Sequence, residues 1–291
     1  LITTGPPHST HLIGLKIHNK YKLKWIVDLR DPWTEIFYLK NRFRFNFSRQ
    51  KNKKLESEVL ENSDAIITTV EEKYHKILSD KVSNKEKIFK IYNGFDKSVY
   101  EKISINKTNQ FNIAFTGVLS KNHNYKVFKD AIELLNPKRN RLRIKLILAG
   151  RIDMDLKNIF SKNIEIDYKG YVNHEEAIRL IKSSHLLINF VYENTEETDM
   201  LSGKITEYVA SGSPIINFSN SSKESEYVLK FSKKSFNANS SSVKKVVKFI
   251  NDEYNDWIAG KYQKSPIDNI DSLSRESLTK RLLNIINKIN S

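Results

Sequence analysis

Short continuous apolar runs alternate with longer stretches of helical periodicity along the whole chain. In the first part, apolar runs with the length and β-branched content of buried strands lie at residues 24–28, 63–68 and 88–92. Apolar side chains at helical spacing lie between them, at residues 11–19, 55–61 and 71–78. Strands and helices that alternate in this way form parallel βαβ units. The pattern therefore predicts an α/β domain built on a parallel sheet.

The same alternation resumes after a polar and unpatterned stretch. Predicted strands lie at residues 111–115, 143–149, 164–168, 184–190 and 215–218, and predicted helices at residues 125–135, 174–183, 204–210, 226–231 and 243–258. We therefore predict a first domain at residues 1–97, a linker at 98–110, a second domain at 111–265 and a C-terminal helix within 266–291. Because the chain opens inside a strand at residues 1–4 without an initiator Met, the first domain is expected to lack its opening strands.

The segment 199–217 combines acidic, small and apolar residues in an order that indicates a ligand site. Ser202 and Gly203 are predicted to open a short helix whose body begins at Lys204. The free N–H groups and partial positive charge of a helix N-terminus, together with the Lys204 ammonium, would hold a diphosphate. Glu207 lies one turn further in and could accept hydrogen bonds from ribose hydroxyls, while Asp199 before the helix is free to face a sugar ring. The segment therefore predicts a nucleotide-sugar pocket.

An acid, seven residues, Glu207 and then the run Tyr-Val-Ala-Ser-Gly-Ser-Pro-Ile resemble the acidic motif of the family 4 glycosyltransferases. These are retaining enzymes of the GT-B fold, with two facing Rossmann-like domains that each contain a parallel sheet. The family usually has Glu at the first position, and Asp199 shortens this carboxylate by one methylene. The resemblance implies that Asp199 and Glu207 act in the active site and that the last helix crosses back towards the first domain. A solvated acid before an ordinary amphipathic helix is the competing interpretation.

Two loops of the first domain resemble those of bacterial family members that build cell-surface polysaccharides. They are Gly-Pro-Pro-His-Ser at residues 5–9 and Asp-Leu-Arg-Asp-Pro-Trp at residues 28–33. The resemblance implies that His8, Arg30 and Asp31 line the acceptor side of the cleft, with His8 as a catalytic residue. Two other interpretations stay open: a helix-capping loop residue for His8, and a structural ion pair for Arg30 and Asp31.

Strand ends of the second domain supply further candidate donor contacts. Gly117 would let the backbone approach a phosphate, and Lys121 is a candidate phosphate contact. Arg151 follows the next strand and could grip a diphosphate in bidentate fashion. The resemblance implies that Tyr171 or Val172, in a glycine-containing turn, contacts the nucleobase. For Lys121 the competing interpretation is an ordinary surface lysine. For Tyr171 and Val172 it is a plain strand-to-helix connection.

Several classes of protein and site are disfavoured by what the sequence lacks. Neither Gly-x-Gly-x-x-Gly nor a Walker-type Gly-Lys-Ser occurs, which argues against dinucleotide oxidoreductases and P-loop NTPases. Without Cys there is no thiol nucleophile and no Cys-ligated zinc. We interpret Asp153-Met-Asp155 as a solvated turn, so the enzyme is expected to be metal-independent, with no cofactor besides its donor substrate. His185, on an apolar strand, is interpreted as a core residue.

The net charge of +15 suits nucleic acid, anionic lipid and phosphorylated ligands equally well. Its densest part is a basic run with interleaved aromatic residues between Lys40 and Lys54. Given the family resemblance, we expect this run to meet an anionic membrane surface or the acceptor, and we expect no nucleic-acid partner. A solvated basic loop is the competing interpretation. We expect a cytoplasmic protein, with a peripheral position on the inner face of the membrane as an option.

These features together favour a hexosyltransferase. It would move a sugar from a nucleoside diphosphate sugar to a glycan or lipid-linked hydroxyl acceptor with retention, in the synthesis of a cell-surface polysaccharide or glycolipid. Two alternatives stay open: a nucleotide-sugar epimerase of the same fold, and a non-catalytic relative that only binds nucleotide or glycan. A nucleic-acid binder, which rests on charge alone, comes third.

Overall fold

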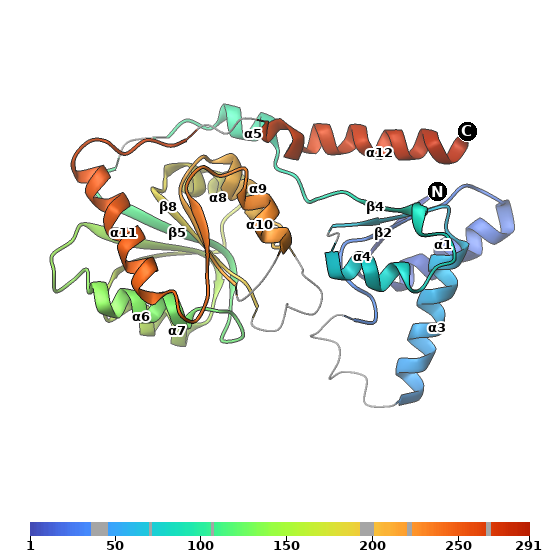
Figure 1. The fold of residues 1–291 in the computed structure, drawn as a ribbon, viewed down its shortest axis with the longest axis horizontal. Helices are drawn as coiled ribbons and strands as arrows, with labels where there is room; N and C mark the ends of the chain where they lie inside the picture. Colours follow the sequence, from blue (N-terminus) through green and yellow to red (C-terminus); the bar gives the residue numbers. More distant parts are fainter. Residues whose placement is uncertain (36–45, 70–71, 106–107, 193–200, 220–222, 266–268) are drawn as a thin grey trace. The chain divides into compact units, whose positions relative to one another are not determined.

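The computed structural model describes residues 1–35, 46–69, 72–105, 108–192, 201–219, 223–265 and 269–291 (Figure 1). The chain divides into two compact units. The first contains Leu1–Asn93 and Arg275–Ser291, and the second contains Gly94–Glu193 and Ser202–Ser274. Each unit is built on its own parallel sheet, so the predicted α/β class with two parallel sheets is confirmed.

The first unit contains a four-stranded parallel sheet in the order β1-β2-β3-β4. Its strands are β1 (Ile2–Gly5), β2 (Ile26–Leu29), β3 (Ala65–Thr68) and β4 (Ile88–Lys90). Its helices are α1 (Ser9–Tyr21), α3 (Asn46–Asn62), α4 (Glu72–Ser79), the 3-10 turn η1 (Lys85–Lys87) and α12 (Arg275–Asn290). Although α12 follows the second unit in sequence, it belongs to the first unit, where Leu278 and Ile285 are buried.

A glycine lets α1 lie directly on the sheet. A Cβ on Gly14 would lie 2.6 Å from Cγ2 of Thr3 and 2.8 Å from the Trp25 ring. The Trp25 indole N–H donates to the Thr3 hydroxyl at 2.9 Å, and that hydroxyl lies 2.9 Å from Nδ1 of His11 on α1. Because the Thr3 hydroxyl accepts from Trp25, its own proton is free for His11. Burial lowers the pKa of His11 to about 4, so the imidazole is neutral at pH 7.

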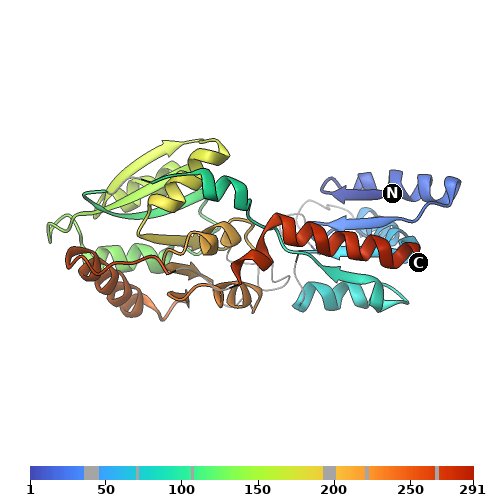
Figure 2. The ribbon, with the colours of Figure 1, turned by 90° about the horizontal axis from the view of Figure 1, so that it is seen from above.

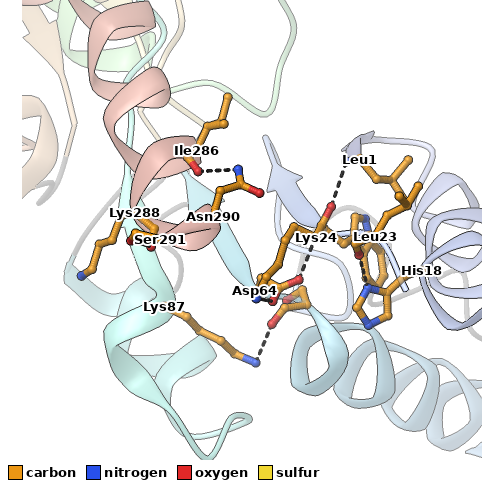
Figure 3. Close-up of polar contacts among 12 residues, drawn as sticks. Leu1, His18, Leu23, Lys24, Asp64, Lys87, Ile286, Lys288, Asn290 and Ser291 are labelled. Carbon is orange, nitrogen blue, oxygen red and sulfur yellow. Dashed lines mark hydrogen bonds and ion pairs between the residues drawn. The ribbon is translucent and has the colours of Figure 1, made fainter. Parts of the chain in front are cut away.

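Side chains fasten the N-terminal ends of the strands in the first unit (Figure 3). Asp64, just before β3, accepts the backbone N–H of Trp25 at 2.8 Å and pairs with the Lys24 ammonium at 3.1 Å. The Lys87 ammonium caps the end of α3 by donating to the carbonyls of Glu61 and Ser63 at 2.9 and 3.0 Å. Burial lowers the pKa of Lys87. These contacts leave the opposite, C-terminal ends of the strands for function.

The second unit contains a six-stranded parallel sheet in the order β10-β9-β8-β5-β6-β7. Its strands are β5 (Phe111–Leu119), β6 (Ile144–Ile152), β7 (Glu165–Gly170), β8 (Leu186–Phe190), β9 (Ile215–Phe218) and β10 (Ser235–Ala238). Its helices are α5 (Lys97–Lys102), α6 (Lys126–Leu135), α7 (Met154–Ser161), α8 (His174–Ser183), α9 (Ile205–Ala210), α10 (Lys223–Leu229), α11 (Val243–Ile258) and the 3-10 turn η3 (Ile270–Leu273).

The core of the second unit lies between this sheet and α6, α7 and α11. Its centre is aromatic, since the rings of Phe128 and Phe190 lie 5.6 Å apart and those of Phe190 and Phe218 lie 5.1 Å apart. Helices α8, α9 and α10 lie on the other face of the sheet (Figures 1 and 2). His185 accepts the Asn112 N–H at 3.0 Å and stacks on Phe111, which confirms its prediction as a structural residue.

Three elements of the second unit escaped the sequence pattern. Helix α5 lies in the stretch predicted to be a linker, α7 begins at Met154 within the predicted turn at residues 153–155, and β10 forms the edge of the sheet. All three are short or lack a clear apolar period, so burial by neighbouring elements decides their structure. No helix among the described residues has the length and apolar composition needed to cross a membrane.

We expect Gly14→Val to destabilise the first unit by about 1–3 kcal/mol, because the added atoms overlap Thr3 and Trp25. Urea unfolding followed by tryptophan fluorescence measures this loss. Ile13→Val, at a position of α1 that is 61% exposed, is the control and is expected to change stability by less than about 0.5 kcal/mol. Equal stability of the two variants would contradict the close packing of α1 on β1.

Candidate functional site

The centre of the second sheet is a topological switch point. From β5 the chain moves outward to β6, whereas β8, on the other side of β5, leads outward to β9. The loops that follow β5 and β8 therefore begin next to each other and then lead to opposite sides of the sheet. Backbone contacts connect the two loops near their start: Asn124 N–H donates to Val191 O at 2.8 Å, and His123 forms a β-bridge with Tyr192. Ligands of open α/β sheets bind at such crevices.

Two glycines face each other across β5 and β6 at this edge. Gly117 and Gly150 are partners in the strand register, with φ of +119° and +117°. A Cβ on Gly150 would lie only 2.1 Å from the Gly117 carbonyl oxygen. No L-residue with a side chain fits this backbone, so the strand ends must stay bare. Arg151 follows Gly150 with an exposed side chain.

The Lys204 ammonium lies beside this bare backbone, and no described residue supplies it with a counter-ion. Its Nζ is 3.9 Å from the centroid of the Phe115 ring and 3.2 Å from the point where a Cβ of Gly117 would stand. Among the described residues it forms no hydrogen bond or ion pair. Burial lowers its pKa to about 7, although part of the side chain remains exposed. Burial lowers the pKa of His123 to about 4, and the positive charge of Lys204 acts in the same direction.

The segment before α9 is a tight turn. Ile205 N–H donates to Ser202 O at 3.0 Å, and the Thr206 hydroxyl donates to Gly203 O at 3.2 Å. The helix begins at Ile205 and not at Lys204 as predicted, because Lys204 is the cap residue. Within the described part of the chain, the N–H groups of Gly203 and Lys204 have no hydrogen-bond partner.

Glu207 is held by two residues that the sequence analysis did not single out. Its Oε1 lies 2.8 Å from Nε2 of His174, the first residue of α8. The Tyr100 hydroxyl on α5 donates to its backbone carbonyl. In the sequence, His174 is a polar residue after the helix-capping Asn173, and this pattern is too common to indicate a site. Tyr100 lies in the stretch predicted to be a linker.

Tyr208 ties the short helix α9 to the sheet. It is fully buried, and its hydroxyl accepts the Thr116 N–H at 2.8 Å. Burial raises its pKa to about 12, so it stays a neutral hydrogen-bonding group. Because α9 has only six residues, it needs such anchors to keep its place.

The other residues predicted to contact the donor also lie on the second unit, and they differ in exposure and in their partners. Lys121 pairs with Asp155 at 2.6 Å, and both side chains are mostly exposed, so a carboxylate competes for its predicted phosphate role. Asp153 caps α7 by accepting the Asp155 N–H at 3.0 Å, so Met154 and Asp155 open a helix and the prediction of a simple turn was wrong. Tyr171 is 93% exposed at the start of the β7–α8 connection, and Val172 beside it is half-buried.

His8 lies in an aromatic group of the first unit. Its ring stacks on Trp33 with centroids 5.2 Å apart and lies 5.8 Å from the His11 ring. Burial lowers the pKa of His8, and its Nδ1 has no partner among the described residues. It occupies the N-cap position of α1, but its side chain does not cap the helix.

Arg30 is part of a hydrogen-bonded cluster at the C-terminal edge of the first sheet. Its Nε pairs with Asp28 at 2.8 Å, and its guanidinium donates to Asn93 at 3.0 Å. The Thr4 hydroxyl donates to the same Asp28 oxygen at 3.1 Å. Arg30 therefore forms a structural ion pair with Asp28, which lies two residues before it in the sequence.

Two predictions fall wholly or partly outside the described residues. Asp199 lies there entirely. Of the basic run from Lys40 to Lys54, the described part begins with α3 at Asn46.

Comparison with known proteins agrees with this geometry. Residues 110–251 match the family described as Glycosyl transferases group 1. This match spans just under half of the chain and contains the switch point, the glycine pair and Glu207. No curated protein matches the sequence.

Solved structures match along almost the whole chain and show the fold. HepE of Anabaena aligns with a TM-score of 0.67 at 14% identity, covering 99% of this chain and 78% of HepE. TarM of S. aureus aligns at 0.64 and 16%, covering 100% of this chain and 54% of TarM. A Listeria monocytogenes protein assigned as a UDP-N-acetylglucosamine 2-epimerase aligns at 0.54 and 10%, covering 98% and 73%. The fold is that of the GT-B glycosyltransferases.

We expect Gly150→Ala to destabilise the second unit by more than about 3 kcal/mol, because strain at positive φ adds to overlap with the Gly117 carbonyl. Gly170→Ala is the control. It also has positive φ, but open space surrounds it, so a loss of about 1–2 kcal/mol is expected. Chemical unfolding of both variants tests this, and a similar cost at the two positions would contradict the close approach of β5 and β6.

Proposed function

We propose that the protein is a glycosyltransferase that moves a hexose from a nucleoside diphosphate sugar to a hydroxyl acceptor with retention. The observation that carries this proposal is the partly buried Lys204 ammonium beside Gly117, which has no counter-ion among the described residues and lies within the segment that matches the glycosyltransferase family. A cation that loses its hydration without gaining a carboxylate is poised for an anionic ligand. A diphosphate is the anion that this reaction releases.

The donor roles follow from this anchor. Lys204 and the free N–H groups of the turn before α9 would meet the departing diphosphate, an electrostatic task. Arg151 would add a second cation from the neighbouring strand end. Glu207 would accept the ribose hydroxyls, and Tyr171 or Val172 would contact the nucleobase.

Uridine diphosphate sugars are the donor class that the structural neighbours suggest. HepE was solved in complex with UDP and glucose and in complex with UDP-glucose. A point mutant of TarM was solved with UDP and α-GlcNAc-glycerol among its ligands. We propose the same donor class here, with Asp199 at the donor sugar.

The proposal includes transfer without a metal ion or another cofactor. The charge of the leaving diphosphate would be balanced by Lys204 and Arg151. The acidic pair that could suggest a metal has other partners, since Asp153 caps a helix and Asp155 pairs with Lys121.

The acceptor would be a glycan or a lipid-linked hydroxyl, approached from the first unit through His8, Arg30 and Asp31. On α3 of that unit, Phe47 is 76% exposed among basic residues, as suits an anionic membrane surface. We therefore propose a role in cell-surface polysaccharide or glycolipid synthesis, at a peripheral position on the cytoplasmic face of the membrane.

A nucleotide-sugar epimerase is the second candidate, favoured by the structural match to the Listeria monocytogenes protein. An epimerase would convert the donor without an acceptor. A transferase would release nucleoside diphosphate only slowly without one, and faster when an acceptor is added.

We expect wild-type protein to bind a nucleoside diphosphate and Glu207→Ala to bind it about 10- to 100-fold more weakly, because charge-assisted hydrogen bonds to ribose are lost. Calorimetry with a panel of nucleoside diphosphates measures this. Glu175→Ala, at an exposed position on α8, is the control and should bind as wild type does. If no member binds, or if Glu207→Ala binds as tightly as wild type, the pocket assignment is wrong.

We expect the affinity for UDP to fall as the pH rises from 7 to 9, by up to about tenfold per pH unit. The terminal phosphate is already mostly ionised at pH 7, whereas the free protein loses the Lys204 proton above its pKa of about 7. The bound diphosphate favours the ammonium, so binding must take up a proton. Lys204→Met should bind weakly at pH 7 with little further pH dependence. A flat wild-type profile would remove Lys204 from the phosphate role.

A further inference from the structure

Three helices of the second unit meet at Glu207. The residue lies on α9, its carboxylate meets His174 of α8, and its backbone carbonyl accepts from Tyr100 of α5. The next residue, Tyr208, is anchored to β5 through Thr116. Hydrogen bonds therefore hold the backbone at Glu207 and Tyr208 in place. The orientation of the Glu207 carboxylate then depends on its side-chain torsions.

His174 reaches Glu207 because of how α8 begins. Asn173 caps this helix by accepting the Glu176 N–H at 2.9 Å, so His174 is its first residue. The capping bond fixes the backbone from which the imidazole projects. The side chain of His174 is 46% exposed and that of Glu207 is 15% exposed, so the imidazole reaches solvent while the carboxylate keeps a small exposed part.

The hydrogen bond from His174 makes the two carboxylate oxygens of Glu207 differ. His174 Nε2–H donates to Oε1, which sets the imidazole tautomer and the plane of the carboxylate. Oε2 has no partner among the described residues and is not one of the buried atoms without a partner. An acceptor held in this way can receive the hydroxyls of a ribose without first losing the conformational freedom of a glutamate side chain.

We propose that His174 is a positioning residue that orients the Glu207 carboxylate for the ribose hydroxyls of the donor. This inference rests on the proposed nucleotide-sugar site. It assigns to His174 a part in recognising the ribose, separate from the nucleobase and the diphosphate.

The test compares a ribonucleotide with a ligand that lacks the hydroxyls. Binding of UDP and of 2′,3′-dideoxy-UDP is measured by calorimetry for wild type, His174→Ala, His174→Gln and the control Glu175→Ala. We expect His174→Ala to weaken UDP about 3- to 10-fold and to leave the dideoxy ligand unchanged. His174→Gln, whose amide N–H can replace Nε2–H, should restore most of the UDP affinity. Glu175→Ala should match wild type for both ligands.

A double variant separates positioning from a merely structural effect. In the background of Glu207→Ala, adding His174→Ala should cause no further loss of UDP affinity, because its effect passes through the absent carboxylate. Equal losses for both ligands, an additive double variant or tighter UDP binding by His174→Ala would each overturn the inference. Failure of wild type to bind UDP or any other nucleoside diphosphate would overturn the proposed function itself and this inference with it.

Discussion

The second unit is organised around the partly buried ammonium of Lys204, which has no carboxylate partner among the described residues. Desolvation disfavours the charged form of Lys204, and the neighbouring Phe115 ring compensates for only part of this cost. A protein that only had to be stable would place an apolar side chain here. The arrangement makes sense when a diphosphate completes it, because the same burial that weakens the free ammonium strengthens its attraction to a bound anion.

The backbone around this charge is shaped for the same purpose. The glycine pair Gly117 and Gly150 removes side chains from the strand ends, so a ligand can reach the main chain and Lys204. A six-residue helix cannot hold Glu207 in place alone, and buried Tyr208 and Tyr100 anchor it. Structural hydrogen bonds of neutral tyrosines thus support the charged groups that face the ligand.

Features that depend on the local sequence pattern could be predicted. Apolar periodicity located most strands and helices, and the acidic motif located Glu207 and Lys204 on one short helix or at its start. Contacts between distant segments could not be read in this way. His174 and Glu207 are brought together by the fold, the pairing of Arg30 with Asp28 depends on side-chain direction, and the lowered pKa of Lys204 depends on burial. Tyr100 was missed because α5 is too short to show a period.

A crystal structure of the protein soaked with UDP tests the central claim most directly. The account predicts the β-phosphate within hydrogen-bond distance of the Lys204 ammonium, above the backbone of Gly117, with the ribose hydroxyls on Glu207. A nucleotide bound elsewhere, or a Lys204 ammonium that stays on the Phe115 ring without touching the phosphate, would contradict it.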